Sequence, residues 1–98
     1  MRIVFRGDRL AAIRTDHAER TKLPFAVIQS CQRKLVILEA APDERTLRNW
    51  KSLHYEQLKG DRAGQRSIRL NKQWRLVFNL DETTSPPTIE VLDVEDYH

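Results

Sequence analysis

Apolar and polar residues alternate along two neighbouring stretches in the second half of the chain, residues 65–70 and 74–80. This period of two is typical of β-strands, and the short polar connection between the stretches predicts a hairpin. Because successive side chains of a strand point to opposite faces, Trp74 and Phe78 share one face and Arg75 lies on the other. We expect the tryptophan face to be buried in the core, which turns Arg75 outward.

Residues 25–40 show the spacing of an amphipathic helix rather than that of a strand. Apolar residues recur there at steps of three and four, and Pro24 suits the first helical turn. The apolar positions are Ile28, Cys31, Leu35 and Leu38. Because the opposite side is polar, we expect this helix to lie on one face of a sheet. Cys31 is then a small core residue, since no neighbouring base or cation marks it as a nucleophile.

Shorter elements are predicted on both sides of this helix. Residues 1–5 are β-prone but too short to stand alone, so they should pair with a later strand. Asp8 is placed to cap a short helix, and Asp43, after the helix-breaking Pro42, is placed to cap another. The remaining strand candidates are residues 53–58 and 88–94.

The order of these elements indicates the fold class. Most helical patterns precede most strand patterns, which favours an α+β fold with a mainly antiparallel, twisted sheet. The N-terminal strand and the helices should pack on that sheet. A chain of 98 residues is long enough to bury a core without disulfides, and we expect a single domain over residues 1–98.

Composition narrows the class of protein further. The single cysteine excludes a disulfide within the chain and a thiolate cluster for a metal, and His17 has no second ligand at helical spacing. No apolar run approaches the roughly 18 residues of a membrane span, and charged residues interrupt the N-terminal segment. We therefore expect a cytoplasmic protein that does not bind a membrane, a metal or any other cofactor.

Charge is distributed unevenly along the chain. Residues 48–75 carry eight basic and two acidic side chains, whereas residues 76–98 carry six acidic side chains and no basic one. A cationic segment of this kind neutralises phosphates and is typical of nucleic-acid binding; a solvated surface is the other interpretation. The residues that we expect to bind nucleic acid are Lys59, Arg62, Arg66, Arg69 and Lys72.

Two motifs in this half of the chain resemble a known family. Residues 58–78 read LKGDRAGQRSIRLNKQWRLVF, in which Gly60 and Gly64 mark a turn that needs unusual backbone angles, and the C-terminus reads EDYH. Together these motifs resemble the HigB branch of the RelE-type bacterial toxins, the plasmid maintenance killer proteins. The similarity is strong over the C-terminal half of the chain and looser before it.

The resemblance implies a fold, an activity and partners. The fold is that of the RelE-like toxins and microbial ribonucleases. The activity is that of an endoribonuclease that cleaves mRNA in the ribosomal A site and so inhibits translation. The implied partner is a HigA-like antitoxin with a helix-turn-helix domain, which silences the toxin and represses their operon. The toxin would contact the ribosome and mRNA directly, and operator DNA only through the antitoxin.

RNA cleavage without a metal needs a base for the ribose 2′-hydroxyl, cations for the phosphate and an acid for the leaving oxygen. Arg75 and Lys59 are our candidates for the phosphate. His98 is the best acid or base, because imidazole titrates nearest neutrality. Asp96 can orient a histidine or take the proton itself, and Tyr97 can stack on a base or donate its hydroxyl. We expect folding not to depend on these side chains.

The position of the family's histidine differs in this chain. In the family it commonly lies two residues before the Leu-Lys-Gly motif, where this chain has Glu56, and His54 lies two residues further upstream. If this segment is extended, both side chains project from the same face, so either can occupy the family's position. We keep His54 as the catalytic candidate and Glu56 as the alternative.

A second interpretation is a non-catalytic module that uses the same cations to bind RNA or a protein. Both interpretations need the basic segment. Only the toxin interpretation requires residues 96–98 to lie beside Arg75, so that proximity distinguishes the two.

Overall fold

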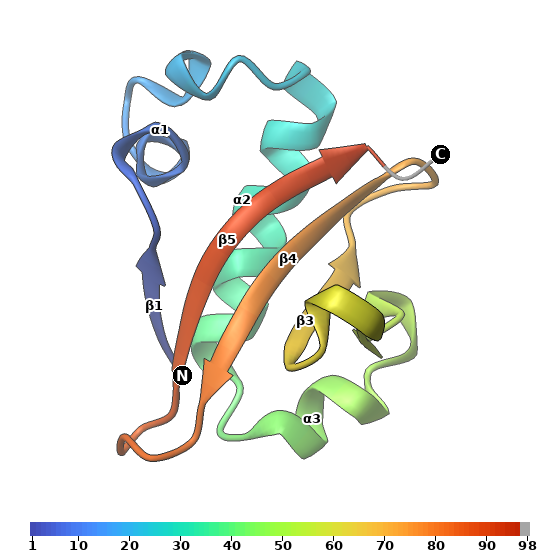
Figure 1. Cartoon of the computed structure of the whole chain (residues 1–98). Helices are drawn as coiled ribbons and strands as arrows, with labels where there is room; N and C mark the ends of the chain where they lie inside the picture. Colours follow the sequence, from blue (N-terminus) through green and yellow to red (C-terminus); the bar gives the residue numbers. More distant parts are fainter. Residues whose placement is uncertain (97–98) are drawn as a thin grey trace.

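A five-stranded mixed sheet forms the centre of the molecule in the computed structural model, which describes residues 1–96 (Figure 1). The strands lie in the order β1-β5-β4-β3-β2. They are β1 (Arg2–Phe5), β2 (Glu56–Gln57), β3 (Gln65–Arg69), β4 (Trp74–Asp81) and β5 (Thr88–Asp96). β1 pairs with β5 in parallel, and the other three pairings are antiparallel. The predicted mainly antiparallel sheet is confirmed.

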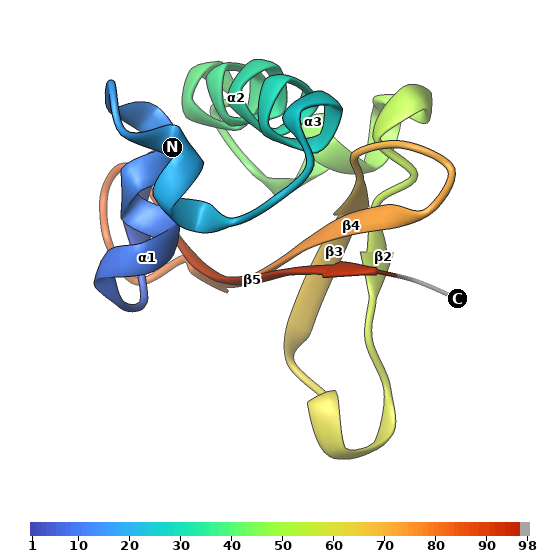
Figure 2. The same ribbon diagram turned by 90° about the horizontal axis from the view of Figure 1, so that it is seen from above.

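The longest helix covers one face of this sheet. Figure 2 shows the sheet nearly edge-on, with α2 on one side and the loop between β2 and β3 projecting on the other. The α-helices are α1 (Asp8–Ala11), α2 (Phe25–Ala40) and α3 (Glu44–Asn49). The 3₁₀ turns are η1 (Ala12–Arg14), η2 (Ala18–Thr21), η3 (Lys51–Leu53) and η4 (Gly60–Arg62). This arrangement confirms the α+β class. None of the helices in residues 1–96 is long and apolar enough to cross a membrane.

The core lies between α2 and the central strands. Leu35 of α2, Phe78 of β4 and Ile89 of β5 are fully buried in one apolar cluster. The alternation of β4 therefore has the predicted direction, with the Phe78 face turned to the helix. Trp74 packs against the same cluster but is only half-buried, because it is the first residue of β4.

Three local predictions had different outcomes. Cys31 is buried as expected, and burial raises the pKa of its thiol to about 12, so the thiol stays protonated at neutral pH. Asp43 caps α3 as expected, because its carboxylate accepts a hydrogen bond of 3.0 Å from the backbone N–H of Thr46. Asp8 does not cap α1: the cap is Gly7 (φ 88°), and Asp8 lies in the first turn. At that position its negative charge interacts favourably with the helix dipole.

Residues 53–58 form less strand than the sequence predicts. β2 contains only Glu56 and Gln57, since Lys51–Leu53 fold into η3. His54 ends that turn in a left-handed conformation, with φ 47° and ψ 49°. Leu53 is fully buried, so the core anchors the turn. His54 therefore lies outside the regular strand, just before β2 begins.

Replacing Leu35 by alanine is expected to lower the free energy of unfolding by about 2–5 kcal/mol, because it leaves a cavity under the sheet. Val36→Ala is the matched control, since Val36 follows on the same helix but is 60% exposed. Its effect should stay within about 0.5 kcal/mol. Urea denaturation of both variants measures the difference. Equal losses would mean that α2 does not bury the face described above.

Candidate active site

The face of the sheet opposite α2 gathers polar and charged side chains from four strands. In the register of the sheet, Arg75 of β4 lies opposite Arg69 of β3 and Glu95 of β5. Ser67, two residues before Arg69, lies opposite Glu56 of β2. Paired residues share a face, and so do residues two apart along a strand. These side chains therefore form one continuous surface, which is the candidate active site.

Arg75 lies on the predicted face, but it is not outward in the sense of being exposed. The residue is only 6% exposed. Its Nε donates to the hydroxyl of Ser67 at 2.9 Å, and its Nη2 donates to the backbone carbonyl of His54 at 2.7 Å. Nη2 also lies 3.5 Å from the Glu56 carboxylate. The expectation of an exposed side chain is wrong because Ser67 on β3, the His54 carbonyl before β2 and Glu56 on β2 all contact the guanidinium.

His54 and Glu56 reach the candidate active site by different routes. The argument from alternation fails for His54, because its left-handed backbone is not extended. Its exposed imidazole instead lies with Nε2 3.5 Å from Nη1 of Arg69. Glu56 is the first residue of β2, and its carboxylate faces Arg75 as the alternation of a strand predicts. Both candidates for the family's histidine therefore lie at the site, each beside a different arginine.

The end of β5 runs alongside Arg75. Glu95 lies directly opposite Arg75, whereas Asp96, the last residue of the strand, pairs with Trp74 and therefore lies on the α2 side of the sheet. The Asp96 carboxylate accepts a hydrogen bond of 2.8 Å from the amide of Gln73. Tyr97 and His98 lie outside the described residues, so their catalytic roles stay predictions.

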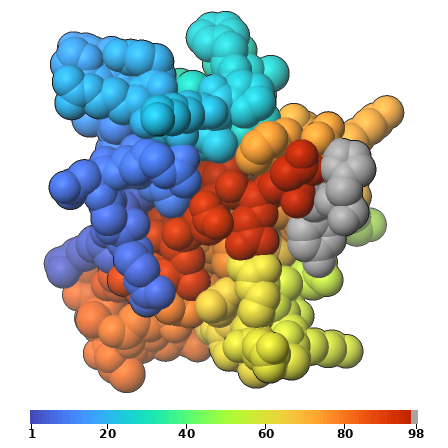
Figure 3. Space-filling model, turned by 45° about the horizontal axis from the view of Figure 1, so that its top comes forward, coloured from blue at the N-terminus to red at the C-terminus, as the bar shows by residue number. Residues whose placement is uncertain are grey.

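The loop between β2 and β3 brings two of the expected cations to the site. Gly60 (φ 67°) and Gly64 (φ 93°) have the positive backbone angles that the sequence predicts for this turn. Lys59 is exposed at its beginning, beside a shallow hollow of about 370 Å³. Arg62 holds the Glu95 carboxylate with both terminal nitrogens, one of them at 2.8 Å. Figure 3 shows the resulting contact between this loop, in yellow, and the red end of β5.

The remaining two expected RNA-binding residues are not brought to this surface. Arg66 lies opposite Phe78 in the register and therefore on the α2 side of the sheet. Lys72 is exposed in the turn between β3 and β4, near Trp74 and the start of α2. Of the five predicted cations, Arg69 lies opposite Arg75, and Lys59 and Arg62 line a hollow together with Glu56.

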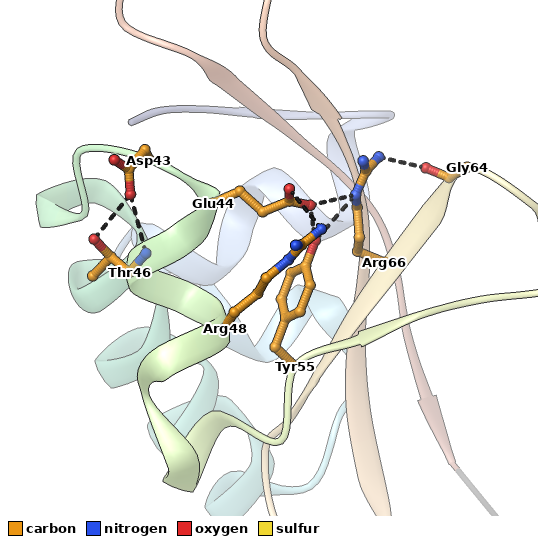
Figure 4. A network of polar contacts seen from close by, with 7 residues as sticks. All are labelled: Asp43, Glu44, Thr46, Arg48, Tyr55, Gly64 and Arg66. Carbon is orange, nitrogen blue, oxygen red and sulfur yellow. Dashed lines mark hydrogen bonds and ion pairs between the residues drawn. The ribbon is translucent and has the colours of Figure 1, made fainter.

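A polar network on the α2 side of the sheet holds the segment that leads into β2, at the edge of the candidate active site (Figure 4). The hydroxyl of Tyr55 donates to the Glu44 carboxylate, and Arg66 Nε donates to the same hydroxyl at 3.1 Å. Arg66 also contacts Glu44 at 3.3 Å, and Arg48 holds the other oxygen of Glu44 at 3.1 Å. Tyr55 lies between the two site residues His54 and Glu56. The network therefore holds that segment against α3 and β3.

Sequence reasoning missed this network. Glu44 and Tyr55 are 11 residues apart and share no repeating spacing that would have indicated a contact. Burial would raise the pKa of Glu44, but the hydrogen bond from Tyr55 and the charges of Arg48 and Arg66 lower it below its ordinary value. Burial and the bond to Glu44 raise the pKa of Tyr55 to about 12. At neutral pH a neutral phenol therefore donates to a charged carboxylate.

Metal ligands do not gather in the same way. Within residues 1–96, no group of three or more His, Cys, Asp or Glu side chains is arranged to hold a metal ion. His17 is exposed and lies 3.6 Å from Glu19. The chemistry available at the candidate active site is that of arginines, a lysine, an imidazole and carboxylates.

Comparison with known proteins shows the family. A family model described as the RelE-like toxin of the type II toxin–antitoxin system HigB matches residues 3–98. The chain belongs to the HigB-like toxin family. It is also similar to Toxin HigB-1 of Vibrio cholerae serotype O1, with 36% identity over 78 residues, which cover 80% of this chain and 82% of the relative. The predicted resemblance to HigB is thus confirmed.

Solved structures of other toxins share the fold of this HigB-like chain. The YoeB/ParE toxin from Agrobacterium tumefaciens matches over 100% of both chains, with 18% identity and a TM-score of 0.61. YafQ from E. coli matches over 98% of this chain and 93% of its own, with 13% identity and a TM-score of 0.64. A chain of the YoeB–YefM complex from Staphylococcus aureus matches over 100% and 97%, with 19% identity and a TM-score of 0.56. At these identities the similarity concerns the fold, which is RelE-like as predicted.

Removing the Tyr55 hydroxyl is expected to destabilise this HigB-like toxin by about 1–2 kcal/mol at neutral pH, because Glu44 and Arg66 lose a buried partner. The loss should shrink at high pH. A group whose pKa is about 12 when folded and about 10 when unfolded stabilises the fold fully below pH 10 and ceases to do so as the pH rises through 12. Urea denaturation of Tyr55→Phe and wild type between pH 8 and about 12 measures both effects.

Glu39→Gln serves as the control for this variant, because it weakens the exposed Arg14–Glu39 pair. An exposed pair contributes at most about 1 kcal/mol. A Tyr55→Phe protein as stable as wild type, with the same pH dependence, would contradict the structural role of the network.

Proposed function

We propose that this toxin is a ribosome-dependent endoribonuclease that cleaves mRNA in the ribosomal A site and so inhibits translation. The observation that carries the proposal is Arg75, a guanidinium fixed by Ser67 and His54 on a surface that also presents Arg69 and Lys59. A phosphate placed there meets cations whose positions are set before it arrives. Such preorganised charge is the largest contribution that a protein makes to phosphate chemistry.

The proposed reaction is an attack of the ribose 2′-hydroxyl on the adjacent phosphate. Arg75 and Lys59 neutralise the charge that develops on the phosphate oxygens. His54, whose imidazole is exposed beside Arg69, is our choice for moving a proton at the 2′-hydroxyl or the leaving 5′-oxygen. Tyr97 and His98, which follow β5, supply the complementary proton transfer, and Asp96, which pairs with Trp74 and not with Arg75, is kept as the residue that orients His98. No step requires a metal.

Glu56 has a different role in this proposal. Its carboxylate is an ion-pair partner of Arg75, and Glu95 plays the same part for Arg62. RNA phosphate therefore exchanges with carboxylates that already occupy these arginines. The exchange keeps the buried charge of Arg75 compensated both with and without RNA, which a buried arginine requires.

We infer that the cognate partner is a HigA-like antitoxin with a helix-turn-helix domain. The family of this chain is defined by type II toxin–antitoxin systems, and the related YoeB toxin forms a complex with YefM. The toxin then contacts the ribosome and mRNA in the cytoplasm, and operator DNA only through the antitoxin. Coexpression with the helix-turn-helix protein of the neighbouring gene should relieve the growth arrest that the toxin causes alone.

Deleting Tyr97 and His98 is expected to abolish mRNA cleavage on programmed ribosomes while leaving a folded protein that still binds its antitoxin. Termini contribute little to a core, so the loss would be chemical. The controls are His17→Ala and Cys31→Ala, which lie outside the candidate active site and should keep cleavage. Undiminished cutting by the shortened protein would remove the tail from the mechanism. If no form of the protein, wild type included, cleaved mRNA, the result would favour a non-catalytic binding module.

Arg75 needs a gentler substitution than alanine. We expected folding not to depend on it, but its burial and its bonds to Ser67 and His54 show that the fold uses it. Arg75→Lys keeps the charge and loses the planar fork that reaches two partners at once. Cleavage should fall about 100- to 1000-fold, as for loss of one preorganised donor. The urea midpoint of the same sample shows whether the protein is still folded.

Salt dependence tests the phosphate contacts separately from the chemistry. Lys59→Ala is expected to weaken RNA binding regardless of sequence and to reduce the slope of log affinity against log salt by about one unit. Glu95→Gln should act in the opposite direction, since it frees Arg62 from its carboxylate. Filter binding of a single-stranded RNA between about 50 and 200 mM salt measures both. Slopes that stay equal in all three proteins would contradict a phosphate site here.

A further inference from the structure

Trp50 is an apolar side chain that the fold leaves at the surface. The residue is 43% exposed, although Leu47 before it and Leu53 after it are fully buried. The two leucines anchor the junction between α3 and η3, so the backbone of Trp50 is well fixed while its ring faces solvent. Within residues 1–96, Trp50 is not part of the apolar core cluster.

The indole borders a surface hollow with polar walls. The hollow has a volume of about 510 Å³ and is lined by Thr46, Asn49, Trp50 and Lys51. Thr46 precedes Trp50 by four residues, so the two share a face of α3, and Asn49 is the last residue of that helix. Proteins bind nucleotides with aromatic faces, which stack on the bases, with amides, which hydrogen-bond to base edges, and with ammonium groups, which contact phosphates.

The charge around the hollow favours a polyanion. Arg45 and Lys51 are exposed, and neither forms an ion pair with any residue that the structure describes. The acidic residues of this segment are already engaged, since Asp43 caps α3 and Glu44 lies in the network with Tyr55. The exposed surface beside the indole is therefore cationic.

The hollow also lies close to the candidate active site along the chain. The backbone N–H of Leu53 bonds to the carbonyl of Trp50, and that of His54 bonds to the carbonyl of Lys51, so a single 3₁₀ turn joins the two places. Such a turn rises about 2 Å per residue, which separates Trp50 from His54 by about 8 Å along its axis. Trp50 and His54 are therefore the two ends of one short turn.

We propose that Trp50 stacks on an unpaired base of the RNA strand that occupies the candidate active site, while Lys51 contacts a phosphate next to that base. The proposal rests on the proposed function in one respect, that single-stranded RNA is the ligand of the site. It adds a subsite that holds RNA beside the cleaved position. Because every base has a stacking face, this subsite contributes affinity and register rather than a strict sequence preference.

Tryptophan fluorescence tests the stacking directly, because the chain has two tryptophans, Trp50 and Trp74. In a Trp74→Phe protein, emission comes from Trp50 alone. A single-stranded 2′-O-methyl RNA, which cannot be cleaved, should quench it to saturation. An oligonucleotide of the same length with abasic positions keeps the phosphates but should quench little. Equal quenching by both would mean phosphate contact without stacking and would overturn the proposal.

Trp50→Phe is a second variant, which keeps the test valid if Trp74→Phe does not fold. It retains Trp74, so quenching should disappear while most of the RNA affinity remains, because phenylalanine still stacks. Trp50→Ala should lose about 5- to 150-fold in affinity, the equivalent of about 1–3 kcal/mol for one stacked base. Its urea midpoint should match that of Trp50→Phe. Wild-type affinity in Trp50→Ala would contradict the subsite.

Two further outcomes separate this proposal from others. If purified antitoxin changes Trp50 emission and RNA does not, the hollow belongs to a protein interface and the proposal is wrong. The oligonucleotide cannot be cleaved, so quenching does not depend on catalysis. Saturable, base-dependent quenching together with failure of every form to cut mRNA would therefore leave the RNA subsite standing and refute only the nuclease mechanism.

Discussion

A buried guanidinium sets the conditions for the rest of the candidate active site. Arg75 is almost inaccessible to water, and a buried charge is tolerated only with good partners. Those partners come from three places: the Ser67 hydroxyl on β3, the His54 carbonyl before β2, and the Glu56 carboxylate on β2. The arginine thus requires the short edge strand to lie where it does. The left-handed turn at His54 serves the same requirement, because it aims the carbonyl at Arg75.

The surrounding contacts keep this arrangement from relaxing. On one side, the network of Glu44, Tyr55 and Arg66 ties the segment before β2 to α3 and β3. On the other side, Arg62 binds Glu95 and ties the β2–β3 loop to the end of β5. Both contacts join segments that a single helix or strand does not connect. A site built across several elements stays precise only when such contacts fix each element.

Carboxylates contact two of the site's arginines, Arg75 and Arg62, and this bears on the proposed binding of RNA. If RNA phosphate replaces Glu56 or Glu95, as proposed, one anion is exchanged for another, and the gain in affinity is smaller than the count of cations suggests. Lys59, exposed at the start of the loop, contributes without such an exchange. Contacts outside the arginine cluster, such as the proposed stacking on Trp50, would then carry a larger share of RNA binding.

The sequence by itself determined the long helix, the central hairpin and the family. The alternation in 74–80 and the helical spacing in 25–40 depend on which faces are apolar, and that property is local. It therefore predicted the Phe78 face, the buried Cys31 and the position of Arg75 opposite the helix. The tertiary structure alone decided that Arg75 is buried, that Arg66 serves a network on the other face, and that His54 leaves the strand. These features depend on contacts between residues 8 to 22 positions apart, such as Arg75 with Ser67 and Arg66 with Glu44. No periodicity along the chain records such contacts, because their partners meet only once the sheet has formed.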